Sequence, residues 1–191
     1  MTAQFTAEAA PTGEFVRQPN RFTDRLTDPE PDRYVLYVSL ACPWAHRSVI
    51  VRRLLGLEDA LALRVVDPLR DERGWRFTLD EGDTDPVTGA AFVTDLDRES
   101  DPAFDGRATV PFVYDTVDRR IVTNDYPQIT LDLATAWTPL HAPGAPDRGQ
   151  LTEADVRLFT TLARFDAAHH GHFTCNRSTL TAPGPRPGPP R

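Results

Sequence analysis

Hydrophobic and polar residues alternate in short blocks along the chain, and the first blocks predict a strand, a helix and a second strand. Residues 34–39 form an apolar block rich in aromatic and β-branched residues, which is typical of a buried strand. The next segment begins at Pro43 and ends before Gly56, and its apolar residues recur at helical spacing. Residues 63–66 form the second strand. The apolar positions of the helix are Ala45, Val49, Ile50 and Leu54.

The pattern changes over residues 67–108, which are acidic and interrupted by Asp-Pro and Asp-Gly pairs. We expect a long excursion there, with one helix at about Phe92–Glu99. Two short strands follow at residues 109–114 and 120–123, joined by a turn, and a helix follows from residue 124 to about 136. A βαβ unit, an excursion and a ββα unit together predict an α/β domain with a thioredoxin-like fold over residues 34–137.

The flanking segments are predicted to be less regular. Residues 1–33 are polar and rich in proline, which predicts an extended arm anchored by Phe5, Phe15 and Phe22; a disordered leader is the alternative for about the first ten residues. A linker rich in proline and glycine covers residues 138–150, and a capped helical pattern begins at Leu151. Residues 178–191 predict a disordered tail.

Composition narrows the possible functions. The chain has 191 residues, a net charge of −7 and two cysteines. The acidic balance argues against nucleic-acid binding, and two distant cysteines fit a reducing compartment better than a secreted disulfide framework. The N-terminal segment has no signal-peptide pattern and no apolar run is long enough for a membrane span. We therefore expect a cytoplasmic protein.

Cys42 is the first candidate for chemistry, because the strand–Cys–Pro–helix order places it at a helix N-terminus. Free backbone N–H groups and the helix dipole stabilise a thiolate there, and the thiolate is the nucleophilic form. Position 45 is alanine, so an external thiol would have to release an oxidised Cys42. The alternative is a small buried cysteine that fills the core.

A second group of reactive side chains lies near the C-terminus. Its members are His169, His170, His172 and Cys175. These are zinc-ligand types, but their spacing matches no standard zinc pattern. We expect a surface turn and no metal.

Several motifs, taken in order, resemble one family. They are Gly13-Glu-Phe-Val-Arg-Gln-Pro-Asn-Arg-Phe, Ser39-Leu-Ala-Cys-Pro-Trp-Ala-His-Arg, Asp71-Glu-Arg-Gly-Trp-Arg-Phe, Gly106-Arg-Ala-Thr-Val-Pro and Val122-Thr-Asn-Asp-Tyr-Pro-Gln-Ile. The chain resembles the glutathionyl-hydroquinone reductases, the Xi class of glutathione transferases, over residues 12–137 and 151–177. The resemblance implies a thioredoxin-like domain followed by an all-α glutathione-transferase domain, of which residues 151–177 would be a remnant.

The resemblance also implies a site for glutathione, the co-substrate. Cys42 would be the catalytic residue and would form a mixed disulfide with it. Val110, before a cis Pro111, would pair through its backbone with the cysteinyl part of the ligand. Asp125 and Tyr126 would hold the γ-glutamyl end, although the family often has Glu-Ser there. Trp75, Arg107 and Thr109 complete the predicted site. From the residues alone, Trp75 can equally be a packing residue, Pro111 a trans proline and Asp125 a plain helix N-cap.

The chain departs from the family after the linker. The helices expected before Leu151 are missing, and with them the family's acid/base tyrosine; His169 stands where a further tyrosine is expected. Two functions therefore remain open. One is an enzyme whose partners are a small-molecule thiol and an aromatic glutathione conjugate. The other is a non-catalytic, truncated thiol-binding module. The resemblance implies a homodimer, but part of the family's dimer interface would be missing from this chain. The oligomeric state therefore stays open.

Overall fold

A four-stranded sheet forms the centre of the computed structural model, which describes residues 18–146 and residue 156. The strand order is β2-β1-β3-β4, with β1 and β2 parallel and the other neighbours antiparallel. This topology confirms the α/β prediction. The strands are β1 (Tyr34–Val38), β2 (Leu61–Val65), β3 (Phe112–Asp115) and β4 (Arg120–Thr123).

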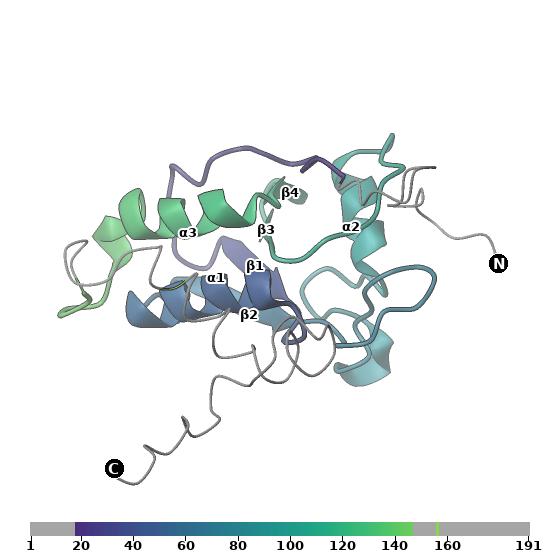
Figure 1. Ribbon diagram of the computed structural model, residues 1–191, viewed down its shortest axis with the longest axis horizontal. Coiled ribbons are helices and arrows are strands. Elements are labelled where there is room, and N and C mark those ends of the chain that lie inside the picture. The colour runs from purple at the N-terminus through teal and green to yellow at the C-terminus, as the bar shows by residue number, and fades with distance from the viewer. Residues whose placement is uncertain (1–17, 147–155, 157–191) are drawn as a thin grey trace, which may run out of the picture.

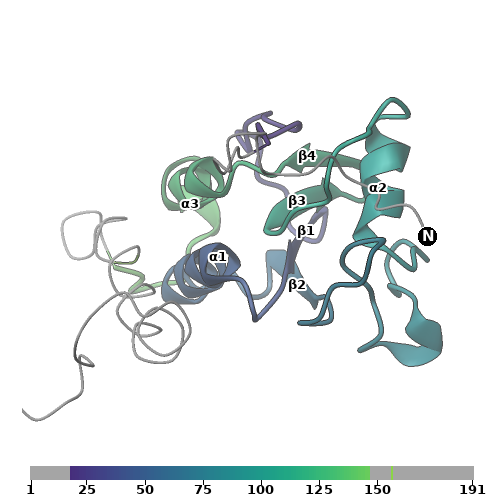
Figure 2. The same cartoon turned by 45° about the vertical axis from the view of Figure 1, so that its right-hand side comes forward.

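Helices cover both faces of the sheet. The helices α1 (Pro43–Leu54) and α3 (Tyr126–Thr135) lie on one face and α2 (Val93–Ser100) on the other, as Figures 1 and 2 show. Each face of the sheet has its own hydrophobic core. Strand β1 supplies Leu36 and Val38 to the core on the side of α1 and α3, and Tyr37 to the core on the side of α2; all three are fully buried. Burial on both faces explains why this strand is continuously apolar instead of alternating.

The C-terminal end of α1 packs closely against the start of the linker. Gly56 has a φ of +64° and follows α1 in a Schellman arrangement, in which Leu57 N–H donates to Arg52 O at 2.9 Å. A Cβ at Gly56 would lie 2.3 Å from the Cβ of Ala142, so glycine is required there. The predicted linker therefore packs on the end of α1, and it begins with a 3₁₀ turn, Thr138–Leu140.

The predicted strand at residues 109–114 was placed too early. Strand β3 begins only at Phe112, and the Val110–Pro111 peptide bond is cis, as the resemblance implied. Proline has no N–H to donate to a strand ladder, so residues 106–111 run outside the sheet. The second strand begins at Leu61, two residues earlier than expected.

The acidic excursion is held to the sheet by a buried polar network. Asp85 is fully buried and accepts hydrogen bonds from Tyr37 Oη at 2.6 Å and from Thr88 Oγ1 at 2.7 Å. Arg64 Nε donates to the other oxygen of the same carboxylate at 3.2 Å. These bonds, together with the 3₁₀ turn Glu81–Asp83, give a long segment with little regular structure a fixed course.

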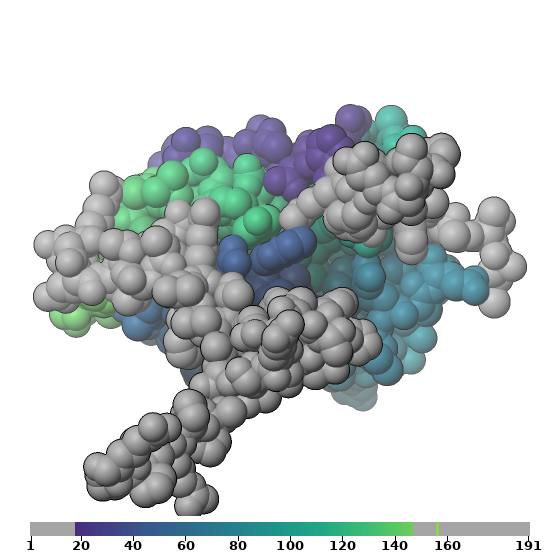
Figure 3. Space-filling model, viewed as in Figure 1, coloured from purple at the N-terminus to yellow at the C-terminus, as the bar shows by residue number. Residues whose placement is uncertain are grey.

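The described part of the arm pairs with β4 through a bridge between Thr23 and Thr123. Figure 3 shows it in purple beside the green segment that contains α3. Asp24 N–H donates to Val122 O at 3.2 Å, and Leu26 is 2% exposed in the core. Arg25 Nε donates to the buried carboxylate of Asp132 at 2.8 Å. The predicted anchor Phe22 stacks on Phe104 with ring centroids 6.1 Å apart.

Some predictions fall on residues that the structure does not describe. Phe5, Phe15, the helix expected from Leu151, His169 and the other His/Cys residues, and the tail at 178–191 all lie outside the described residues. Within the described ranges, no helix is long and apolar enough to cross a membrane.

Candidate functional site

The thiol of Cys42 lies at the N-terminus of α1. Cys42 is the N-cap residue with extended backbone angles, and Pro43 is the first residue of the helix. Proline suits this position because a helix leaves its first N–H groups without intrahelical partners. The side chain is partly exposed, and its Sγ lies 3.6 Å from the carbonyl oxygen of Val110. The helix therefore presents the thiol to solvent and to the cis-proline segment at the same time.

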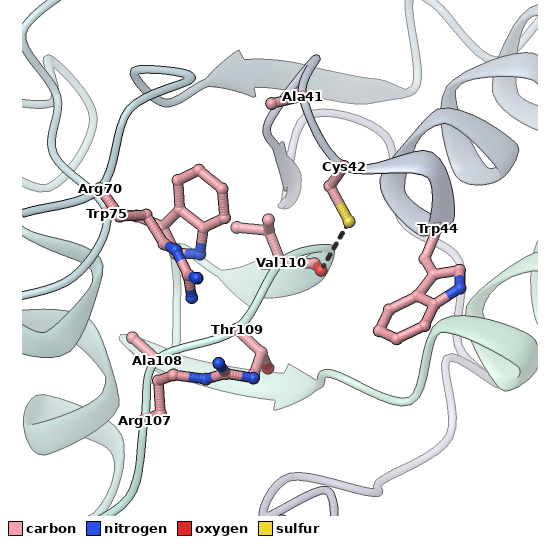
Figure 4. A pocket seen from close by; sticks show the side chains of 9 residues that line it. All are labelled: Ala41, Cys42, Trp44, Arg70, Trp75, Arg107, Ala108, Thr109 and Val110. Atoms are coloured by element: carbon pink, nitrogen blue, oxygen red, sulfur yellow. Dashed lines mark hydrogen bonds between the residues drawn. The ribbon is translucent and has the colours of Figure 1, made fainter. Parts of the chain in front are cut away.

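A pocket of about 250 Å³ opens beside this thiol. Figure 4 shows the Cys42 sulfur between the two indoles of Trp44 and Trp75, above the Val110 carbonyl. The lining residues are Ala41, Cys42, Trp44, Arg70, Trp75, Arg107, Ala108, Thr109 and Val110. The pocket thus brings together five of the residues that the sequence predicted: Cys42, Trp75, Arg107, Thr109 and Val110.

The described lining of the pocket is cationic. It includes the guanidinium groups of Arg70 and Arg107, and none of the lining residues carries a carboxylate. The Arg70 guanidinium lies over the Trp75 ring, 5.1 Å from its centroid. A site with two arginines and the partly exposed indole of Trp44 favours an anionic ligand with extended, partly apolar groups.

Asp125 and Tyr126 do not line this pocket. Asp125 is the N-cap residue of α3, as one of the alternatives expected, but its side chain makes no capping hydrogen bond. Tyr126 stacks on Trp44 with centroids 5.2 Å apart and planes 6° apart, and Arg47 lies over the Tyr126 ring. Tyr126 thus contacts a residue that lines the pocket, Trp44, and does not line the pocket itself. The direct contacts that were assigned to Asp125 and Tyr126 remain predictions, and Pro111 is buried behind the lining.

Sequence reasoning missed Trp44 and Arg70 as lining residues. Trp44 lies within the cysteine motif, so its nearness to the thiol was a usable signal. Arg70 is exposed on the excursion, and no spacing rule relates it to Trp75 before the fold is known.

Metal binding finds no support in residues 18–146. No group of three or more His, Cys, Asp or Glu side chains there is placed to hold an ion. The four His/Cys residues considered as zinc ligands fall outside this range.

Comparisons with known proteins identify the family of this chain. The family model "Glutathione S-transferase, C-terminal domain" matches residues 133–191. The glutathionyl-hydroquinone reductase PcpF of Sphingobium chlorophenolicum is 31% identical, over 86% of this chain and 73% of the relative. That alignment spans 231 residues, more than the 191 of this chain, so the relative has residues within the aligned region that this chain lacks.

Solved structures give the same result. The Xi glutathione transferase of Phanerochaete chrysosporium has a TM-score of 0.79 at 31% identity, covering 87% of this chain and 80% of that one. The glutathione-bound structure of YqjG from Escherichia coli K-12 has a TM-score of 0.72 at 32% identity, covering 79% and 70%. The chain belongs to the glutathionyl-hydroquinone reductase family, the Xi class of glutathione transferases.

Proposed function

We propose that the protein is a glutathione-dependent transferase that reduces aromatic glutathione conjugates, with Cys42 as its nucleophile. The observation that carries the proposal is the position of the Cys42 thiol. It belongs to the N-cap residue of α1, lies 3.6 Å from the carbonyl oxygen of Val110 and lines a pocket with two arginines. A helix N-terminus favours the nucleophilic thiolate form of a cysteine. The partly exposed side chain of Cys42 is also accessible to a sulfur substrate.

The proposed reaction has two sulfur-exchange steps. The Cys42 thiolate attacks the glutathionyl sulfur of the conjugate, so a Cys42–glutathione disulfide forms and the carbon–sulfur bond breaks. The electron pair of that bond stays on the aromatic carbon, which takes up a proton. A second glutathione thiolate then attacks the mixed disulfide and leaves as glutathione disulfide, which restores Cys42. The aromatic compound gains two electrons, which come from the thioether sulfur of the conjugate and from one glutathione thiol.

The pocket offers complementary groups for glutathione. The tripeptide carries two carboxylates and one ammonium group, and Arg107 and Arg70 provide positive charge beside the thiol. In the proposed pose, the cysteinyl backbone pairs with Val110, and Asp125 at the start of α3 receives the γ-glutamyl ammonium. The proposed use of free thiols as reductants would place the reaction in a reducing compartment such as the cytoplasm.

A second candidate is a module that accepts glutathione on Cys42 but does not turn over aromatic conjugates. The observation that favours it is the aligned span of 231 residues against a chain of 191, because the relative has residues here that this chain lacks. A group that protonates the leaving carbon typically contributes 10²–10⁴-fold to a rate. Loss of that group alone would leave sulfur exchange intact and turnover slow.

Mass spectrometry of the purified protein after exposure to glutathione disulfide tests the shared step. We expect one glutathionyl group on the Cys42 peptide, released by excess glutathione, and none in Cys42→Ser. An adduct on another peptide, or none, would refute both candidates. Turnover of a glutathionyl-hydroquinone is then assayed beside a complete family member. Comparable rates support the enzyme, and an adduct with far slower turnover supports the binding module.

A further inference from the structure

One wall of the thiol pocket lies outside the sheet. Residues 106–111 belong to no strand, yet this segment carries Arg107, Thr109 and Val110 into the pocket. Backbone N–H and C=O groups that have no strand partner need other hydrogen bonds to hold a fixed position. Residues 106–111, the wall of the pocket, therefore depend on hydrogen bonds from outside the sheet for their position relative to the Cys42 thiol.

Gln18, on the N-terminal arm, binds the wall through both ends of its amide. Its Oε1 accepts a hydrogen bond from Arg107 N–H at 2.7 Å, and its Nε2 donates to Arg107 O at 3.2 Å. The amide thereby takes the place of a neighbouring strand. The packing is close, because a Cβ at Gly106 would lie 2.8 Å from the Gln18 amide atoms. The glycine at position 106 is what lets this amide reach the backbone.

Asn124 makes a second connection between the arm and the wall. It is 5% exposed, and its Nδ2 donates to Thr109 Oγ1 at 3.1 Å. Its Oδ1 accepts from Phe22 N–H at 3.3 Å, and its own N–H donates to Phe22 O at 3.0 Å. Asn124 also directly precedes Asp125, the N-cap of α3. One buried amide therefore joins the arm, the pocket wall and the start of a helix.

We propose that Gln18 and Asn124 are positioning residues for the pocket, so that the arm is a working part of the glutathione site. The inference rests on the proposed function, since it names the residues that hold Arg107 and Thr109 where the ligand would contact them. Displacement of such a wall by about 1 Å is enough to weaken binding and catalysis, because the ligand contacts depend on fixed geometry.

A matched control separates positioning from general anchoring of the arm. The exposed ion pair between Arg120 Nη1 and Asp24 Oδ2, at 2.8 Å, also holds the arm but does not touch the wall. Arg120→Gln therefore loosens the arm at a different point. The three full-length variants to compare with the wild type are Gln18→Ala, Asn124→Ala and Arg120→Gln.

Three measurements are made on each variant: glutathione affinity by calorimetry, the rate at which iodoacetamide alkylates the Cys42 peptide, and the melting temperature. Iodoacetamide is small and uncharged, so it needs the thiol but not the wall. We expect Gln18→Ala and Asn124→Ala to raise the glutathione Kd about fivefold or more, the scale of one lost hydrogen bond. The alkylation rate should stay within about twofold of wild type, and Arg120→Gln should leave the Kd within about twofold whatever its melting temperature.

Other outcomes would overturn the inference. A Gln18→Ala protein that binds glutathione as the wild type does shows that the wall holds its position without the arm. An equal loss of affinity in Arg120→Gln shows general loosening instead of positioning. If Asn124→Ala fails to fold, Gln18→Ala still decides, because its side chain is only partly buried. A wild type that does not bind glutathione refutes the proposed function, and the inference with it.

Discussion

Asp97 is a buried carboxyl group in α2 whose replacement should stabilise the protein at neutral pH. The residue is 2% exposed, and its Oδ2 has no hydrogen-bond partner within the described part of the chain. Burial disfavours the charged form and raises the pKa of Asp97 from 3.8 to about 8. An asparagine side chain at this position would have a similar shape without an ionisable proton. We therefore predict that Asp97→Asn removes the free-energy cost of taking up a proton on folding.

The sign and size follow from proton linkage. Between pH 4 and pH 8 the folded protein holds a proton on Asp97 that the unfolded chain has released, so stability falls as pH rises through this window. One pKa unit corresponds to about 1.4 kcal/mol, which gives a loss on the order of 4 kcal/mol by pH 7 as a ceiling. Relaxation around the carboxyl group reduces that figure, and we expect about 1–3 kcal/mol, the usual cost of an unsatisfied buried polar group.

Thermal unfolding of the wild type and Asp97→Asn at pH 5, 7 and 8 measures the effect. At about 2–4 °C per kcal/mol, the variant should gain several degrees over the wild type at pH 8 and clearly less at pH 5. Asp59→Asn, at an exposed turn residue, is the control for the removal of a carboxylate that is not buried. If the difference in melting temperature between Asp97→Asn and the wild type is the same at every pH, or shrinks as pH rises, the pKa of Asp97 is not raised in the folded protein.

Three further predictions concern the site and the arm. Asp125→Ala should weaken glutathione binding about tenfold, because a charge-assisted hydrogen bond is worth about 1.5–3 kcal/mol; equal affinity by calorimetry would remove Asp125 from the site. Arg70→Gln should weaken it about two- to threefold at low salt and less at high salt, and a salt-independent loss would contradict the electrostatic role. Asp132→Ala should lower the unfolding free energy by about 1–3 kcal/mol in urea, because the buried Leu26 N–H loses its acceptor; a loss under about 0.5 kcal/mol would contradict it.

The regular elements could be predicted because their residues carry periodic patterns. Strand β1 is apolar on both faces, and α1 shows helical spacing after a proline at its first position. The start of β3 was predicted too early because Thr109 and Val110 look like strand residues. A pattern of residue types does not show that the chain joins the sheet only after Pro111.

The candidate site could be predicted in part, for a physical reason. Cys42 is recognisable because its reactivity depends on local features, a helix start and a following proline. The roles of Gln18 and Asn124 depend instead on contacts with residues far away in the chain: 89 residues separate Gln18 from Arg107, and 102 separate Asn124 from Phe22. Single amide side chains have no periodicity, so nothing in the sequence distinguishes them from ordinary surface amides.

The two halves of the proposed reaction make different demands on the chain. Sulfur exchange needs a thiol, a surface along which the ligand backbone can lie and charge to orient it, and the pocket draws all of these from residues between Ala41 and Val110. Protonation of the leaving carbon needs an acid on the far side of the bound sulfur. None of the residues that line the pocket is an Asp, Glu, His or Tyr, so in the proposed reaction the proton comes from a group outside this lining or from solvent. In the proposed reaction, the loss of the proton donor would therefore slow the reduction of aromatic conjugates and leave the acceptance of glutathione on Cys42 intact.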